Sequence, residues 1–199
     1  MAITASDIRE ALLRWIEAMH VSASELNELD GKLGDGDLGV TLSKCATNVA
    51  ETLPNMPDNI AGQFQACARA CMEASGSSFG TLLAVGFLAA AKASKEKSSL
   101  ELKDVAVIMK EVADAISTRG GANAGDKTFL DSILAVQSCL EDRSPQVDVR
   151  TAIRTAVAST ILEYREKPNR IGRARMFGDR SIGMDDPGMV AFAHMVDCV

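Results

Sequence analysis

Aromatic residues are scarce in this sequence, at 4% of 199 residues, whereas alanine, leucine, valine and methionine are plentiful. Small and straight-chain side chains favour helices that pack closely, while aromatic and β-branched residues favour strands. No segment alternates strictly between apolar and polar residues over four or more positions with β-branched enrichment, which is the pattern of a half-buried strand. We therefore predict an all-α protein without a β-sheet.

Long apolar runs and an excess of positive charge are also absent. No segment approaches the roughly 18 apolar residues that a membrane span needs, and the first residues lack a basic stretch that leads into an apolar run. The net charge of -6 repels nucleic acid and anionic membranes, so a phosphate-bearing partner would need a local cation. These absences predict a cytoplasmic protein that binds neither nucleic acid nor membrane.

Cysteine is present, but without the paired spacing of a zinc site. The five cysteines lie in apolar surroundings, and Cys67 and Cys71 are four residues apart on a predicted helix. Such spacing favours core packing over redox or zinc chemistry, and an odd number of cysteines indicates a reducing compartment.

The sequence also lacks internal repeats, low-complexity tracts and interdomain linkers, so residues 1–199 are predicted to form a single domain. Its apolar residues recur at helical spacing and predict about eight helices joined by loops. Thr4 and Asp7 have the spacing of a capping box and begin the first helix, and a second ends near Leu29. The others include residues 39–53, 59–73, 79–94, 126–141 and 149–165. The 79–94 segment is apolar on nearly all sides, which predicts a helix buried at the centre of the structure.

Four of the connecting loops are rich in glycine and charge: residues 30–41, 74–81, 119–128 and 172–188. If successive helices alternate in direction, these loops meet at one end of the bundle. That end is the candidate functional site, because functional residues concentrate on loops that a rigid scaffold positions.

The first of these loops gathers three carboxylates within eight residues, Asp30, Asp35 and Asp37, among glycines that let the backbone fold. Three such groups repel one another, so a multivalent cation is their natural neutraliser, and oxygen-only ligation suits magnesium or calcium. No glutamate stands eleven positions after Asp30 or Asp35, which excludes a calcium EF-hand loop. The alternative is that Asp37 caps the following helix while Asp30 and Asp35 are solvated turn residues.

Backbone amides follow the aspartates at the predicted N-terminus of a helix. Free N–H groups of Leu38, Gly39, Val40 and Thr41 there would bind phosphate, and magnesium would bridge that phosphate to the carboxylates. The loops therefore predict a nucleotide polyphosphate site. The serines of the 74–78 stretch would add hydroxyls, or simply cap a helix, and Arg173 would add a fixed charge, or be an ordinary surface arginine.

Common nucleotide-binding and kinase motifs are missing. The sequence holds no Walker-A GxxxxGK[ST] motif, no Rossmann glycine fingerprint after a strand, and no HRD-type catalytic loop. A nucleotide would therefore bind through an unrelated arrangement, and no residue of this chain stands out as catalytic.

Taken together, the four loops resemble those of the nucleotide-binding L subunit of dihydroxyacetone kinases, the DhaL family. The matching stretches keep the family's order and spacing and cover nearly the whole chain; they are LDGKLGDGDLGVTL, ASGSSFGTLL, RGGANAGDKTFLD and GRARMFGDRSIGMDDPG. The resemblance implies an antiparallel barrel of eight helices with a magnesium nucleotide at one end.

The resemblance also implies roles for single residues. Asp30, Asp35 and Asp37 would hold two Mg²⁺ ions. The remaining site residues would bind ADP or ATP: the phosphates lie along Leu38, Gly39, Val40 and Thr41 with Ala74 and Ser75, Gly120 and Phe129 border the adenine, and Arg173, Asp186, Pro187 and Gly188 complete the pocket.

The implied activity is phosphoryl transfer to a small ketose that a partner K subunit holds, so the chain is active only with that partner. The resemblance leaves open an M-type phosphotransferase protein, driven by phosphoenolpyruvate, or free ATP as the donor. Leu38 stands where subunits that a phosphotransferase protein rephosphorylates usually carry histidine and ATP-dependent kinases often carry cysteine, so this position matches neither donor. Ser77-Ser78 replaces residues usual in dihydroxyacetone-specific members, so a tetrulose is an alternative acceptor. A homodimer is also compatible. Two other readings are a regulatory nucleotide-binding module and the nucleotide domain of a fatty-acid kinase.

Overall fold

The computed structural model describes residues 2–74, 76–142 and 148–198, and within these ranges it contains helices and no β-strand. None of the described helices is long and apolar enough to cross a membrane. The α-helices are α1 (Ala5–Val21), α2 (Ala23–Leu33), α3 (Leu38–Thr52), α4 (Ile60–Ala74), α5 (Ser78–Ala93), α6 (Leu102–Gly120), α7 (Phe129–Glu141), α8 (Val149–Arg165) and α9 (Pro187–Val196), and the 3₁₀ helices are η1 (Leu53–Asn55) and η2 (Ala174–Ser181). The all-α prediction is confirmed.

Side-chain caps fix where several helices begin. Thr4 and Asp7 form the predicted capping box at the start of α1. Thr128 and Asp131 form another at the start of α7, with the Thr128 amide donating to Asp131 Oδ2 at 2.8 Å. The predicted start of this helix near Asp126 is therefore wrong by three residues, because the box places the first helical residue at Phe129.

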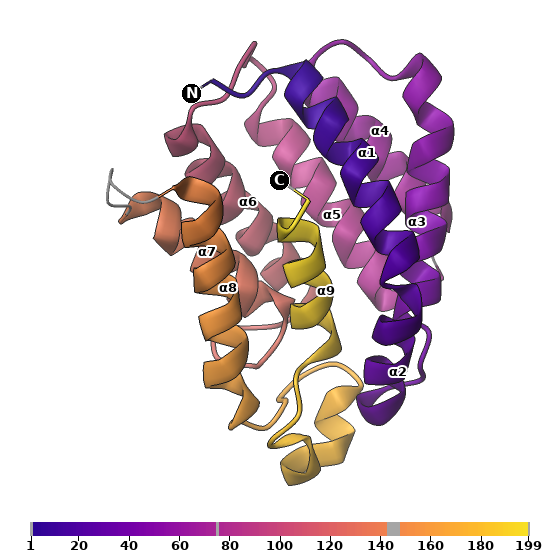
Figure 1. Cartoon of the computed structure of the whole chain (residues 1–199), viewed down its shortest axis with the longest axis vertical. Helices are drawn as coiled ribbons and strands as arrows, with labels where there is room; N and C mark the ends of the chain where they lie inside the picture. Colours follow the sequence, from indigo (N-terminus) through magenta and orange to yellow (C-terminus); the bar gives the residue numbers. More distant parts are fainter. Residues whose placement is uncertain (1, 75, 143–147, 199) are drawn as a thin grey trace.

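The helices form an antiparallel barrel in which successive helices pack side by side (Figure 1). The wall runs from α3 through α4, α5, α6 and α7, and α1 and α9 pack on each other to complete it. Apolar side chains of these helices line an internal cavity of about 520 Å³, with Trp15, Phe64 and Phe87 among them. This alternation brings the starts of α3, α5, α7 and α9 to the same end of the barrel, the end at which α2 and η2 also lie.

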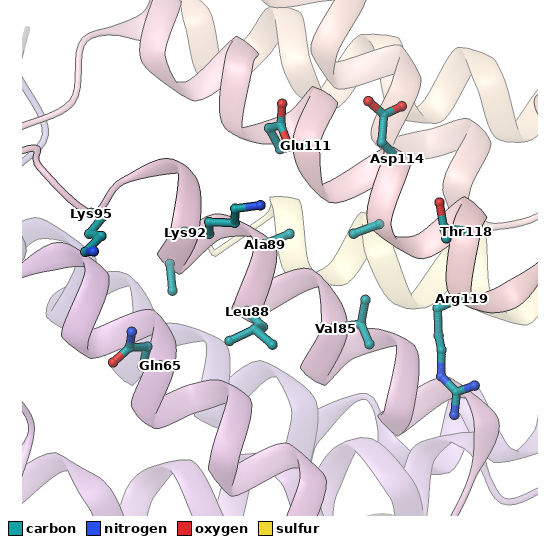
Figure 2. Close-up of a pocket in the computed structure, with 12 residues that line it drawn as sticks. Gln65, Val85, Leu88, Ala89, Lys92, Lys95, Glu111, Asp114, Thr118 and Arg119 are labelled. Atoms are coloured by element: carbon teal, nitrogen blue, oxygen red, sulfur yellow. The ribbon is translucent and has the colours of Figure 1, made fainter.

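Helix α5 is part of the barrel wall, and the prediction that it lies buried at the centre is wrong. Its inner face, with Leu83 and Phe87, lines the internal cavity. Its outer face lines a shallow groove of about 820 Å³ between α4 and α6, where Val85 and Leu88 lie between the charged ends of Lys92 and Arg119 (Figure 2). Leu88 is 54% exposed. Helix α5 is therefore apolar on both faces because one face lines the cavity and the other lines the groove.

The cysteines pack in the core, as their surroundings predict. Cys45, Cys67, Cys71 and Cys198 are buried free thiols, and Cys139 is partly buried. Burial raises the pKa of the Cys67 thiol to about 12, so this side chain stays neutral and behaves as a small apolar group.

Candidate functional site

The three aspartates of the first loop converge at the end of the barrel where α2 meets α3. One carboxylate oxygen from each of Asp30, Asp35 and Asp37 lies within 4.8 Å of the other two. Asp30 belongs to the last turn of α2, so the predicted 30–41 loop is in fact a short connection of residues 34–37 between two helices. Two helix ends therefore fix the outer two carboxylates, and the connection places the third.

Glycines make this convergence possible. A Cβ atom at Gly34 would lie 2.4 Å from Asp30 Oδ1, so a side chain at this position would displace that carboxylate. Gly36 adopts a φ of 75°, which side-chain-bearing residues rarely adopt. The turn is closed by the Asp37 amide, which donates to Asp30 Oδ2 at 2.9 Å.

The carboxylate of Asp37 is not used as a helix cap. Asp37 occupies the N-cap position of α3, but its side chain makes no capping hydrogen bond in the described structure. The alternative in which Asp37 caps the helix therefore fails, although the residue does sit at the predicted place. Three carboxylates that share one centre and are partly open to solvent provide the oxygen ligands that Mg²⁺ prefers.

Only part of the predicted row of amides at the start of α3 is free for a ligand. The Val40 amide donates to Asn27 Oδ1 at 3.1 Å, and the Thr41 amide donates to the Asp37 carbonyl at 2.9 Å. The expectation that Leu38 to Thr41 all offer free N–H groups is therefore wrong for two of the four. The amides of Leu38 and Gly39 make no hydrogen bond among the described residues. The Leu38 side chain is buried in the core.

Arg173 reaches the aspartates from a distant part of the sequence. Its guanidinium forms an ion pair with Asp35. Arg173 stands in the 166–186 loop, which connects α8 to α9 and includes η2, and Figure 1 shows this loop beside α2 at the lower end of the barrel. The structure therefore brings together four of the predicted site residues, three acidic and one basic.

A second group of predicted residues lies at the same end, beside the side chains of Phe79, Leu82 and Phe129. The rings of Phe79 and Phe129 lie 4.8 Å apart between centroids. A Cβ atom at Gly188 would come within 3.1 Å of Phe79, and one at Gly120 would come within 3.2 Å of Leu82. Phe129 is buried, and Gly120 ends α6 directly before the left-handed Gly121.

Asp186 and Pro187 are buried at the start of α9. Asp186 Oδ1 accepts from the Met189 amide at 2.9 Å, and its Oδ2 accepts from Asn169 Nδ2 at 2.8 Å. Burial raises the pKa of Asp186 to about 6, against the lowering effect of these hydrogen bonds. Both carboxylate oxygens thus have protein partners, and Asp186 acts as the cap of α9 in this structure.

The serine-rich loop is only partly described. Ala74 is the last residue of α4, Ser75 lies outside the described residues, and Ser77 caps α5 by accepting from the Gly80 amide at 3.2 Å. The capping alternative therefore holds for Ser77.

Sequence reasoning missed three polar residues that build this end of the barrel. Asn27 binds the Val40 amide, Asn169 binds Asp186, and the ammonium of Lys127 is fully buried among backbone carbonyls. The GDKT stretch was part of a recognised motif, but a lysine after an aspartate in a glycine-rich loop gives no sign of burial.

Comparisons with known proteins agree with this architecture. The model of the DAK2 domain matches residues 32–199. The ADP-binding subunit DhaL of the PEP-dependent dihydroxyacetone kinase of Escherichia coli (strain K12) is 29% identical over 202 residues, which are 98% of this chain and 96% of that protein. A D-erythrulose kinase of Mycolicibacterium smegmatis is 30% identical over 197 residues, which are 92% of this chain and 33% of that protein.

Among solved structures, the dihydroxyacetone kinase of C. freundii in complex with AMP-PNP and Mg²⁺ has the same fold, with a TM-score of 0.73 at 23% identity. The match covers 98% of this chain and 33% of that one. The resemblance that the four loop motifs predict is thereby confirmed, and with the DAK2 model covering most of its length, this chain belongs to the DAK2-domain family.

Proposed function

We propose that this chain is the nucleotide-binding subunit of a two-part ketose kinase, with residues 1–199 forming one nucleotide-binding domain. The observation that carries the proposal is the convergence of Asp30, Asp35 and Asp37 with Arg173 at one end of the barrel. Three carboxylates and one guanidinium form a mixed site that suits a cation and an anion together, which is what a magnesium nucleotide presents.

The chain's own groups would bind and orient the nucleotide. The three aspartates would hold two Mg²⁺ ions, which neutralise polyphosphate charge when bound. The amides of Leu38 and Gly39 at the start of α3, and the guanidinium of Arg173, would bind phosphate oxygens, with Val40, Thr41 and Ala74 beside them. The second group, with Gly120, Phe129 and residues 186–188, would border the base.

The acceptor and its general base would come from a partner K subunit. Phosphoryl transfer depends mainly on positioning and charge neutralisation, and this site provides both without a base of its own. The chain matches almost the full length of the E. coli ADP-binding subunit, which supports a separate subunit with a partner. Its similarity to a D-erythrulose kinase supports a small ketose, either dihydroxyacetone or a tetrulose, as the acceptor class.

A coupled assay tests the proposal. The purified chain is mixed with a K subunit and either dihydroxyacetone or erythrulose. One arm receives free ATP as donor, and the other receives ADP-loaded chain with phosphoenolpyruvate and the phosphotransferase proteins, including the M-type protein. We expect phosphorylated ketose in one arm, dependent on Mg²⁺ and on this chain.

Each outcome of that assay has a defined meaning. Product in only one arm identifies the donor, and the better ketose identifies the acceptor. Binding of Mg·ADP without product in any arm would instead support a regulatory module. Absence of Mg²⁺-dependent ADP binding in calorimetry would contradict the proposal altogether.

Arg173→Ala should have opposite effects on the binding of Mg²⁺ alone and on the binding of Mg·ADP. The guanidinium competes with a cation for Asp35, so its removal should tighten binding of Mg²⁺ alone, by at most about fivefold because exposed ion pairs are worth up to roughly 1 kcal/mol. The same change removes a phosphate contact, so Mg·ADP should bind about tenfold more weakly. Calorimetry with MgCl₂ alone and with Mg·ADP measures both constants.

Arg175→Ala is the matched control, because Arg175 is an exposed arginine of the same loop without an ion pair among the described residues. It should leave both constants unchanged. If both affinities fall together in Arg173→Ala, Arg173 does not compete with the cation.

A further inference from the structure

Lys127 is a lysine in an unusual position. Its side chain is fully buried, and its φ of 61° lies in the left-handed region that glycine favours. Both features cost free energy, since an ammonium loses its hydration on burial and a left-handed backbone crowds the Cβ atom. A lysine in such a place needs compensating contacts, and these indicate what it does.

The Lys127 ammonium donates three hydrogen bonds, all of them to backbone carbonyls. Its Nζ donates to the carbonyl oxygens of Lys167 at 2.7 Å, of Ser181 at 2.8 Å and of Arg165 at 3.3 Å. Arg165 and Lys167 lie at the C-terminal end of α8, where unpaired carbonyls and the helix dipole favour a cation. Ser181 is the last residue of η2. The ammonium therefore ties together the two ends of the 166–186 loop.

Backbone carbonyls of residues 126 and 127 also bind the 166–186 loop. The Lys127 carbonyl accepts from Asn169 Nδ2 at 2.8 Å, and the Asp126 carbonyl accepts from the Arg170 amide at 3.1 Å. The Asn169 amide in turn donates to Ser181 Oγ at 2.9 Å. Residues 171–180 are thus held at both of their ends, by contacts that centre on residues 126 and 127.

The segment held in this way carries Arg173. Outside these anchors the loop is largely exposed, and the Arg173 side chain is 63% exposed at its ion pair with Asp35. An exposed arginine reaches a fixed point only if its backbone is fixed, because its side chain has several rotatable bonds. The contacts at residues 169, 170 and 181 hold its backbone on both sides. The Gly183 amide, which donates to the Arg165 carbonyl at 2.8 Å, and the ion pair of Arg165 with Asp185 hold the far end of the same loop.

We propose that Lys127 is a positioning residue for the candidate nucleotide site: its buried ammonium holds the 166–186 loop so that Arg173 reaches Asp35 and the phosphates. The proposal rests on the proposed function for the identity of the ligand. It assigns no contact between Lys127 and the nucleotide, and the effect on binding that it predicts passes through Arg173. Burial lowers the pKa of Lys127, while the charges of Asp186 and Asp185 favour its protonated form.

A double-mutant cycle tests this dependence. Lys127→Met keeps the unbranched apolar part of the side chain but removes the ammonium, which leaves the three carbonyls without their donor. We expect calorimetry to give an affinity for Mg·ADP about 10- to 100-fold weaker than that of the wild type, as for other residues that orient a binding group. In the Arg173→Ala background, the same substitution should change the affinity by less than about twofold, because the residue through which it acts is gone.

A destabilised control separates positioning from general loss of stability. Leu140→Ala removes a buried side chain of α7 at the opposite end of the barrel and should lower the melting temperature without changing the affinity. If Lys127→Met does not fold, Ser181→Ala enters the same cycle, since it removes the acceptor of the Asn169 amide without leaving a buried charge. Its expected loss of affinity is smaller, about threefold.

Hydrogen exchange gives a second measurement that needs no ligand. In Lys127→Met, amides of residues 169–183 should exchange faster than in the wild type, while those of α4 and α5 should not change. Unchanged exchange, unchanged affinity, or equal losses of affinity in both backgrounds would overturn the role of Lys127. A wild type that does not bind Mg·ADP would contradict the proposed function, and the exchange result would still decide whether Lys127 holds the loop.

Discussion

Asp35→Asn should abolish most of the Mg²⁺-dependent binding of ADP, with an affinity at least about 100-fold weaker than that of the wild type, or roughly 2.8 kcal/mol. The substitution keeps the size of the side chain but removes one charge and one strong ligand from the three that converge. An amide oxygen binds Mg²⁺ weakly compared with a carboxylate, and two remaining carboxylates cannot replace it. Isothermal titration with Mg·ADP, and with ADP in the presence of a chelator, measures the effect.

Asp35 is a cleaner choice than Asp30, because Asp30 Oδ2 also accepts from the Asp37 amide and its loss would disturb the turn. Without ligand, the melting temperature of Asp35→Asn should stay close to that of the wild type, since relief of carboxylate repulsion offsets the loss of an exposed ion pair with Arg173. The rise in melting temperature on adding Mg·ADP should disappear. Asp58→Asn, at an exposed aspartate of the opposite end, is the control, and metal-independent affinity in the wild type would contradict the magnesium site.

Much of this site could be predicted because its signals are local. Three aspartates within eight residues, with glycines between them, can converge only through a short turn, and the structure contains that turn. The caps at Thr4 and Asp7 are also local, because their partners are three residues apart. The common end of the loops followed from alternation of helix direction, which antiparallel neighbours impose.

What could not be predicted depends on partners distant in the sequence. The Val40 amide looked free because its acceptor, Asn27, lies on another helix. Helix α5 looked central because its composition does not say whether an apolar face meets a core, a cavity or an open groove. Nothing in the sequence indicated that Lys127 is buried, because the carbonyls that it binds belong to residues about 40 and 54 positions away.

Gly39→Ala should destabilise the fold by about 2 to 4 kcal/mol, which corresponds to a fall in melting temperature of roughly 5 to 15 °C for a chain of this length. Helix propensity alone predicts the opposite, since alanine stabilises a helix interior by up to about 1 kcal/mol relative to glycine. The steric clash outweighs helix propensity, because a Cβ atom at Gly39 would lie 1.9 Å from the Ala23 carbonyl oxygen. That oxygen belongs to the backbone of α2, so relief of the clash requires one helix to move.

Gly31→Ala is the matched control within α2, because a Cβ atom there meets only Gly36 Cα, at 3.9 Å. It should be neutral or stabilising by up to about 1 kcal/mol, and thermal and urea unfolding of the two variants gives the comparison. Since α2 carries Asp30 and α3 begins directly after Asp37, a shift between these helices separates the carboxylates. Gly39→Ala should therefore also weaken Mg²⁺ binding in the molecules that remain folded. If Gly39→Ala were as stable as Gly31→Ala, α2 and α3 would not be packed as closely as the convergence of the three aspartates requires.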